Sequence, residues 1–438
     1  MRARALRASF ALLCAVSVLG SCASGATTTP PPDSPQSTTV SNPYEDGRRN
    51  GVEELLQKWA DALRTNDVDA LEQVVDPAAD PEFLQAQVRR ANDMAAVPFS
   101  DWGYELVDEP EIPVPSAIAS PLNAADVWAP SVVLRYAVSG PDAESTRRPV
   151  SLVVARRDDE WRIVSDAPVP GTDRTTWRGP WDFGPVIARS VATAGGTSVV
   201  LGHPDQSALV DAVVAELPSA VDAVTSFYGD DWPQSALIFT SGSAAEFAAS
   251  AGDATAESDV AAVTVSDAVR QDRPVTGQRV VFGPGAPARL TDVTTRTVLR
   301  HELTHVAARS DTVDGSPMWV LEGFADYSGY RESDIEFARI APTLSAVVAQ
   351  GGSPTVLPED SDFSAGGVRT TLAYESAWSV FAFVAATFGE PSQRRLYMQL
   401  ADGPKTAAET AGGVASALGI GMDEFVDQWG SWVLEQSR

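Results

Sequence analysis

The chain has few of the residue types that most often cross-link, anchor or charge a protein. Its 438 residues include two cysteines, three histidines and two lysines, Lys58 and Lys405. Hydrophobic residues make up 44% and charged residues 21%, which excludes a wholly disordered chain. A length of 438 residues predicts two or three domains.

Positive charge is also scarce. The chain has 59 Asp and Glu residues against 32 Lys and Arg residues, which gives a formal net charge of -27. Such a surface is poorly suited to phosphate backbones and anionic lipid headgroups. We therefore expect no nucleic-acid partner.

No apolar run is long enough to cross a membrane. Near the N-terminus, three arginines precede an apolar run over residues 10–19, shorter than the roughly 20 residues that a spanning helix needs. The run ends in the sequence LGSC at Cys22, which resembles the lipobox of bacterial lipoproteins. The resemblance implies that residues 1–21 are a removable signal and that lipid on Cys22 anchors the protein to the extracytoplasmic face of the cell membrane. An ordinary secretory signal or a short anchor is the alternative.

On this interpretation the mature protein has no free thiol, because Cys14 leaves with the signal and Cys22 carries lipid. The fold must then be held by its core or by a metal. Residues 22–45 are rich in Thr, Pro and Ser and predict a disordered tether. Without the signal, 29 basic residues face 59 acidic ones, or -30, so anionic lipid should repel the protein apart from its anchor.

Residues 46–169 predict a first folded region of the α+β class. Apolar residues from Val52 to Leu63 recur at helical spacing, and a second short helix is expected after the break at Asn66 and Asp67. Antiparallel strands follow, and the last two form a hairpin. The predicted strands are 102–107, 132–138, 150–155 and 161–164.

This order of elements, above all the hairpin sequence DDEWRIVSD, resembles the NTF2-like superfamily. The resemblance implies a cone-shaped sheet wrapped around helices. No cluster of acids, bases or histidines stands out in the region, so we expect an accessory or binding domain. Residues 170–195 predict a connector that Trp177 and Trp181 hold to a domain surface.

Residues 196–438 predict a second domain with a strand-containing half and then a helical half. A strand at 198–201 precedes an amphipathic helix that starts near Leu209 and contains Pro218, a possible kink. Further strands are expected at 237–239, 263–265 and 279–282, and from Asp292 onward the chain is mostly helical.

The sequence HELTH at residues 301–305 carries the chemistry. On a helix, residues four apart share a face, so His301 and His305 can hold one metal ion with Glu302 beside them. Zinc accepts two nitrogens, one further ligand and one open position. Because only three of 438 residues are histidine, the chance expectation for this pattern is on the order of one in a thousand. The alternative is a pair of exposed or capping histidines.

A third ligand is expected on the next helix, within PMWVLEGFADY at residues 317–327. Glu322 and Asp326 are four apart and share a face. Residues 306–321 leave room for a turn that returns this helix beside the first. Asp326 can then accept a hydrogen bond from the outer nitrogen of a ligand histidine. On its own, Glu322 would read as a surface residue of an amphipathic helix.

The two motifs together resemble the gluzincin metallopeptidases, in particular the peptidase MA-like group, over residues 195–438. The resemblance implies that His301, His305 and Glu322 bind Zn²⁺ and that Glu302 is the general base. A peptide or protein is the implied substrate. No segment resembles the G-x-M-E-N sequence of aminopeptidases, which favours an endopeptidase.

Two further roles follow from the resemblance. Several gluzincins use a tyrosine on a downstream helix to stabilise the oxyanion, and Tyr374 has the best position for this, with packing of its helix as the alternative role. The strand before the motif helix often forms the edge that pairs with substrate. Val280, Val281, Phe282 and Gly283 are expected to do so here.

Two other functions remain open for the sequence. The protein could be an inactive zinc-containing lipoprotein, although the presence of Glu302 and all three ligands opposes this. Alternatively, the NTF2-like domain could bind an envelope ligand near Trp59, Trp102 or Trp161, with the metal domain as a scaffold. The oligomeric state does not follow from the sequence.

Overall fold

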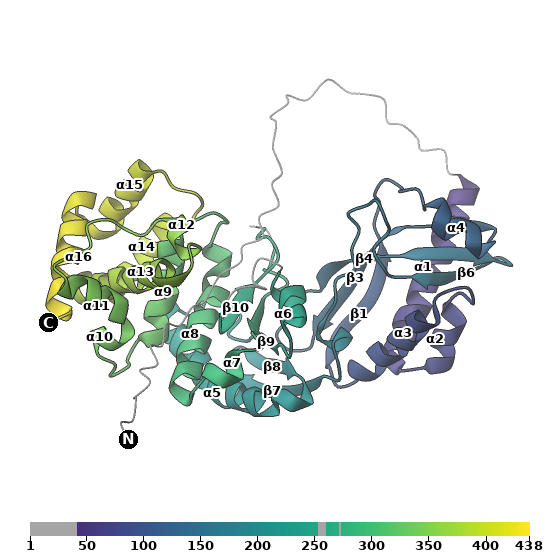
Figure 1. Cartoon of the computed structure of the whole chain (residues 1–438), viewed down its shortest axis with the longest axis horizontal. Coiled ribbons are helices and arrows are strands. Elements are labelled where there is room, and N and C mark those ends of the chain that lie inside the picture. Colours follow the sequence, from purple (N-terminus) through teal and green to yellow (C-terminus); the bar gives the residue numbers. More distant parts are fainter. Residues whose placement is uncertain (1–41, 253–259, 271–272) are drawn as a thin grey trace, which may run out of the picture. The chain divides into compact units, whose positions relative to one another are not determined.

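The computed structural model describes residues 42–252, 260–270 and 273–438. These residues form two compact units, 42–188 and 189–438, and each is treated by itself (Figure 1). The predicted signal, Cys14, Cys22 and the tether up to residue 41 lie outside the described residues.

Within the described residues, no helix has both the length and the apolar character that crossing a membrane requires.

The unit of residues 42–188 combines helices with antiparallel strands, which confirms the α+β prediction for this part of the chain. Its helices are α1 (Pro43–Thr65), α2 (Val68–Val74), α3 (Pro81–Asp93) and α4 (Ser116–Leu122). Its strands are β1 (Phe99–Leu106), β2 (Asp126–Trp128), β3 (Ser131–Val138), β4 (Thr146–Ser151), β5 (Val153–Arg157) and β6 (Glu160–Ser165).

Helix α1 begins before the expected domain boundary at residue 46. The Asn42 side chain accepts a hydrogen bond from the backbone N–H of Tyr44 at 3.2 Å, and Pro43 suits the first helical position. The helix ends at Asn66, whose φ of 52° is left-handed, and Asp67 then caps α2. The predicted break between the two helices is therefore confirmed, whereas the last residues of the expected tether, 43–45, are helical.

The strands of this unit form two three-stranded sheets, ordered β1-β3-β4 and β2-β5-β6. The single strand expected at 150–155 is two strands, because the chain passes from one sheet to the other at Leu152. Helix α1 packs on the first sheet, where Trp59 stacks on Tyr104 with ring centroids 3.9 Å apart. The NTF2-like resemblance stays a prediction.

The connector is held down by its tryptophans, as expected. Trp181 is 1% exposed and lies edge-on to Trp102 at 5.4 Å between ring centroids. Trp177 stacks on Tyr136 at 5.4 Å. The end of the expected connector is not a linker, however, because Ile187–Thr193 forms strand β7.

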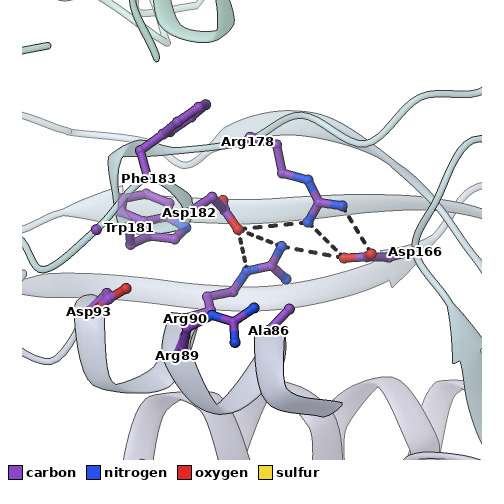
Figure 2. Close-up of a pocket in the computed structure, with 10 residues that line it drawn as sticks. Ala86, Arg89, Arg90, Asp93, Asp166, Arg178, Trp181, Asp182 and Phe183 are labelled. Carbon is purple, nitrogen blue, oxygen red and sulfur yellow. Dashed lines mark hydrogen bonds and ion pairs between the residues drawn. The ribbon is translucent and has the colours of Figure 1, made fainter. Parts of the chain in front are cut away.

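Four charged side chains link α3, the end of β6 and the connector through hydrogen bonds and ion pairs (Figure 2). Arg90 donates through Nε to Asp182 at 2.7 Å, and Arg178 donates to both oxygens of Asp166 at 2.8 and 3.0 Å. Arg90 also reaches Asp166, at 3.4 Å. Burial opposes ionisation of Asp166, but its bonds to Arg178 and the charge of Arg90 outweigh this and lower its pKa.

The unit of residues 189–438 has one sheet and a helical half. Its strands are β7 (Ile187–Thr193), β8 (Gly196–Gly202), β9 (Leu237–Thr240), β10 (Ala262–Val265) and β11 (Arg279–Phe282). Its helices are α5 (Ser207–Tyr228), α6 (Ala244–Ala251), α7 (Ala286–Arg289), α8 (Asp292–Ala308), α9 (Met318–Tyr330), α10 (Phe337–Ile340), α11 (Pro342–Ala349), α12 (Asp360–Phe363), α13 (Gly367–Phe388), α14 (Glu390–Leu400), α15 (Ala407–Leu418) and α16 (Met422–Gln436).

The five-stranded sheet has the order β10-β11-β9-β8-β7. Strands β8, β9 and β11 run parallel, and β10 is antiparallel to β11. Helix α5 crosses back over β8 and continues through Pro218 to Tyr228. The mixed sheet followed by helices agrees with the expected order of the two halves.

Helix α9 is packed between α8 and α13 at two glycines. A Cβ added to Gly329 would lie 2.9 Å from the Thr297 carbonyl oxygen of α8, and one added to Gly323 would lie 2.4 Å from the Ala377 carbonyl oxygen of α13. Only glycine permits such close backbone approach. These two contacts fix how far α9 stands from the helices on either side.

Candidate metal centre

Helix α8 carries the two histidines. Thr291 caps it by accepting a hydrogen bond from the backbone N–H of Thr294 at 3.3 Å. Val298, Leu299 and Leu303 are fully buried and attach the helix to the core. Seventeen helical residues, 292–308, then place both imidazoles in one direction, as their spacing predicts.

Helix α9 brings the expected third ligand to the histidines. The backbone N–H of Met318 donates to Asp360 at 2.8 Å, which satisfies one of the free donors at the start of α9. Glu322 lies in the second turn of the helix and is fully buried. The turn over residues 309–317 returns the chain so that α9 packs against α8.

The structure brings one potential ligand atom from each of His301, His305 and Glu322 within 4.8 Å of the others. The two Nε2 atoms are 3.1 Å apart. Glu322 Oε2 is 3.5 Å from His301 Nε2, and Glu322 Oε1 is 3.9 Å from His305 Nε2. In the described part of the chain, these three side chains are the group of histidines and acids close enough together to hold one metal ion.

These separations fit a zinc ion. Zinc lies about 2.0–2.1 Å from a histidine nitrogen or a carboxylate oxygen. In a tetrahedral site these bond lengths place neighbouring ligand atoms about 3.4 Å apart. The carboxylate of Glu322 also lacks a close hydrogen bond: within the described residues neither buried oxygen meets hydrogen-bond geometry, and the histidine Nε2 atoms lie 3.5 and 3.9 Å away. A buried carboxylate held only at such distances is costly. A cation between the three side chains would remove that cost.

Asp326 sets the orientation of His301. Its Oδ1 lies 2.8 Å from His301 Nδ1, so Nδ1 donates its proton to Asp326 and Nε2 is the nitrogen left to bind a metal ion. His301 is fully buried, and Asp326 is 5% exposed. The predicted hydrogen bond from a ligand histidine to Asp326 is present.

Glu302 is fully buried beside the ligands. The Thr264 hydroxyl oxygen lies 2.7 Å from Glu302 Oε2 and 3.1 Å from the backbone oxygen of Glu302, so its single proton serves one of the two. Thr264 belongs to β10, and this contact joins the sheet to the motif helix. Nothing in the sequence pattern pointed to Thr264, because it lies 38 residues before Glu302 in a short strand.

Burial and mutual charge shift the pKa values of the three candidate ligands. Burial raises the pKa of Glu322 to about 7. Burial alone lowers the pKa of His301, but the charge of Asp326 and the hydrogen bond to it raise that pKa well above its ordinary value. Burial and the neighbouring His301 lower the pKa of His305 well below its ordinary value. The side chains thus compete for protons in a space that suits a dication.

Tyr374 lies at the start of the third turn of α13 and is 5% exposed. Its ring is edge-on to Phe363 with centroids 5.0 Å apart. One turn further, Ala377 makes the close backbone approach to Gly323, the neighbour of Glu322. Tyr374 is therefore one helical turn from the point where α13 crosses α9 near the ligands, and its role in the oxyanion site stays a prediction.

The prediction that residues 280–283 pair with an extended substrate is wrong. Val280, Val281 and Phe282 lie in β11, which pairs with β10 on one side and with β9 on the other. Gly283 follows with its backbone N–H donated to Ala261 at 3.0 Å. Both hydrogen-bonding sides of β11 are occupied, and β10 is the strand at this edge of the described sheet.

Comparison with known proteins finds only solved structures that resemble this chain weakly. No protein-family model matches the chain, and no curated protein matches it. Among solved structures, an M1 zinc metallopeptidase from Deinococcus radiodurans is 12% identical with a TM-score of 0.31, over 72% of this chain and 62% of that one. A point mutant of the M1 zinc metallopeptidase from the same organism, bound to a Tyr-Ser-Ala substrate, is 10% identical with a TM-score of 0.32, over 71% and 61%.

The chain thus spans less than two thirds of the length of these structures. At this level of similarity the likeness supports no conclusion on function, and the three converging ligands with their buried carboxylate neighbours are what characterise the site.

Proposed function

We propose that the protein is a zinc-dependent metallopeptidase that hydrolyses peptide bonds, most simply as an endopeptidase. The observation that carries the proposal is the buried group of His301, His305 and Glu322, with ligand atoms within 4.8 Å of one another and Glu302 on the adjacent position of the same helix. Two imidazoles and one carboxylate leave one position of a tetrahedral zinc site open for water or substrate.

Bound zinc would supply a Lewis acid that polarises a carbonyl and lowers the pKa of water. The protein's own residues do the rest. Glu302 accepts the proton of the attacking water and passes it to the leaving amine nitrogen. When the Thr264 hydroxyl, 2.7 Å from one oxygen of Glu302, donates to that oxygen, it fixes the orientation of the carboxylate. Asp326 keeps His301 in the tautomer that leaves Nε2 for the metal.

Strand β10 supports a peptide as the substrate. It is the edge of the described sheet nearest the motif helix, and its Thr264 contacts Glu302. An extended peptide can add to such an edge through backbone hydrogen bonds, which places its scissile bond next to Glu302. This role passes from β11, where the sequence placed it, to β10.

We further propose that lipid on Cys22 holds the enzyme at the extracytoplasmic face of the cell membrane. The proposal comes from the LGSC sequence after the apolar run. The Thr-, Pro- and Ser-rich residues that follow would let the folded units reach substrates at a distance from the lipid.

The proposal is tested with the mature protein and its Glu302→Gln variant. Zinc content by atomic absorption should be about one per chain in both, because Glu302 is not among the three ligands. Cleavage of a peptide library, read by mass spectrometry, should occur only with the parent protein, and Glu302→Gln should lower turnover about a hundredfold or more.

Glu336→Gln is the matched control, since it removes an exposed carboxylate from the same unit and should leave cleavage unchanged. Cleavage that survives in Glu302→Gln would exclude the assigned base. Zinc in both proteins with cleavage by neither would replace the peptidase with a zinc-containing binding protein.

A further inference from the structure

A cavity of about 600 Å³ lies in the unit of residues 189–438, between the end of α5 and helices α14 and α15. Its volume falls within the range of small-molecule sites. Its wall combines apolar side chains, including Phe227 and Met398, with two arginines, Arg394 and Arg395. Met398 is 41% exposed, so an apolar surface is available at the rim.

Arg394 is a cation without an anion. Its guanidinium lies over the ring of Tyr228 at 4.9 Å, and its Nε is buried with no hydrogen-bond partner. Across the described part of the chain, this guanidinium forms no ion pair. Gly229, whose φ is 113°, ends α5 and lines the same cavity. The aromatic ring holds the planar cation in place while its donors stay available.

The charge around the cavity is the reverse of that of the whole chain, whose formal net charge is -27. The carboxylate in the wall, Glu390, is already engaged: Arg331 donates to its two oxygens at 2.7 and 3.1 Å, and Tyr327 donates to it at 3.1 Å. Arg395 donates hydrogen bonds to the Ser392 hydroxyl and to the Ala417 carbonyl. It has no carboxylate partner in the described residues. The cavity therefore offers two cations to a ligand.

The cavity is separate from the metal centre. Phe227 in its wall packs on Phe324 of α9 with ring centroids 4.7 Å apart. Phe324 is two residues after Glu322, and side chains two apart on a helix point to opposite faces. The metal ligands thus lie on one side of α9 and the cavity on the other.

We propose that this cavity binds an organic carboxylate with an apolar or aromatic body. The carboxylate is held by Arg394 and Arg395, and the body packs against Phe227 and Met398. The planar guanidinium of Arg394 matches a carboxylate with two parallel hydrogen bonds. The site does not depend on the peptidase activity, because none of its residues is a metal ligand or the base.

Phenylacetate is the probe, with neutral phenylacetamide as its isostere, and binding to the zinc-loaded full chain is measured by calorimetry. Arg394→Gln should weaken phenylacetate binding about ten- to a hundredfold, as expected for a charge-assisted hydrogen bond. Arg395→Gln should weaken it less, and phenylacetamide should bind at least about tenfold more weakly than phenylacetate.

Arg339→Gln is the control, because it removes the same charge from an exposed position of α10 and should leave the affinity unchanged. Circular dichroism verifies that each variant is folded. Equal phenylacetate affinity of the parent and Arg394→Gln overturns the proposal, because any carboxylate bound at the metal centre would not respond to Arg394. Equal binding of phenylacetamide, or binding of inorganic phosphate as tight as that of phenylacetate, also overturns it.

Discussion

Asp326 contacts the candidate metal centre through His301 and is not itself one of the three candidate ligands. Its Oδ1 lies 2.8 Å from His301 Nδ1. Asp326→Asn keeps an oxygen that can accept this hydrogen bond but removes the charge that favours the proton on Nδ1. We expect the zinc dissociation constant to rise about ten- to a hundredfold, measured by competition with a chromophoric chelator. Asp334→Asn, at an exposed position, should leave it unchanged; an unaltered affinity in Asp326→Asn would remove the positioning role.

Single residues were predictable where helix geometry places them. His301 with His305, and Glu322 with Asp326, are pairs four apart, and a helix brings such pairs to one face whatever surrounds it. Thr264 has no such rule, because only the packing of β10 against α8 sets its 2.7 Å contact with Glu302. Arg394 was missed for the same reason: its guanidinium lies over the ring of Tyr228, which belongs to another helix.

At the level of elements, α9 has its position set by two glycines. A Cβ on Gly323 would meet the Ala377 carbonyl oxygen at 2.4 Å, and backbone atoms cannot move aside as a flexible side chain can. Gly323→Ala should therefore destabilise the protein by about 1–3 kcal/mol, measured by urea unfolding. It should also weaken zinc binding, because α9 carries Glu322.

The matched control for this prediction is Gly412→Ala, inside helix α15, where an added Cβ meets nothing within 4 Å. Alanine is favoured over glycine in a helix by about 1 kcal/mol, so this variant should be as stable as the parent protein or more stable. If both variants changed the free energy of unfolding in the same direction, close approach at Gly323 would not be the cause.

Most strands were predictable from sequence, but β2 and β7 were missed and the strand order was not predictable. The buried runs at β10 and β11 are both four residues long and mostly apolar, so composition cannot tell an internal strand from one at an edge. Strand β7 gave no signal because none of its residues is fully buried. The connector was therefore extended to residue 195, beyond the unit boundary at 188.

For the molecule as a whole, loss of the Asp166 ion pairs in acid should weaken the unit of residues 42–188 and not the unit of residues 189–438. The pKa of Asp166 is lowered in the folded protein, so its ion pairs contribute stability at a pH above the unfolded value of about 3.9. That contribution is lost as the pH falls through the folded pKa. We expect Asp166→Asn to destabilise the unit of residues 42–188 near neutral pH and to flatten its loss of stability in acid.

Hydrogen exchange read by mass spectrometry follows each unit separately between about pH 6 and about pH 3. Peptides from residues 189–438 should exchange alike in the parent and in Asp166→Asn. Asp173→Asn, at an exposed site of the same unit as Asp166, is the control. Parallel pH profiles for Asp166→Asn and the parent in residues 42–188 would show that these ion pairs do not set the acid response.

The three ligands of the metal centre lie close in sequence, from His301 to Glu322. A link that closes a loop of this length removes about 3 kcal/mol of chain entropy from the unfolded state, and the described residues contain no cysteine to form one covalently. A bound ion would therefore do for α8 and α9 what a disulfide does for a short loop. The stabilisation by the ion would be confined to that helical pair. The sheet and the unit of residues 42–188 therefore depend on their own packing.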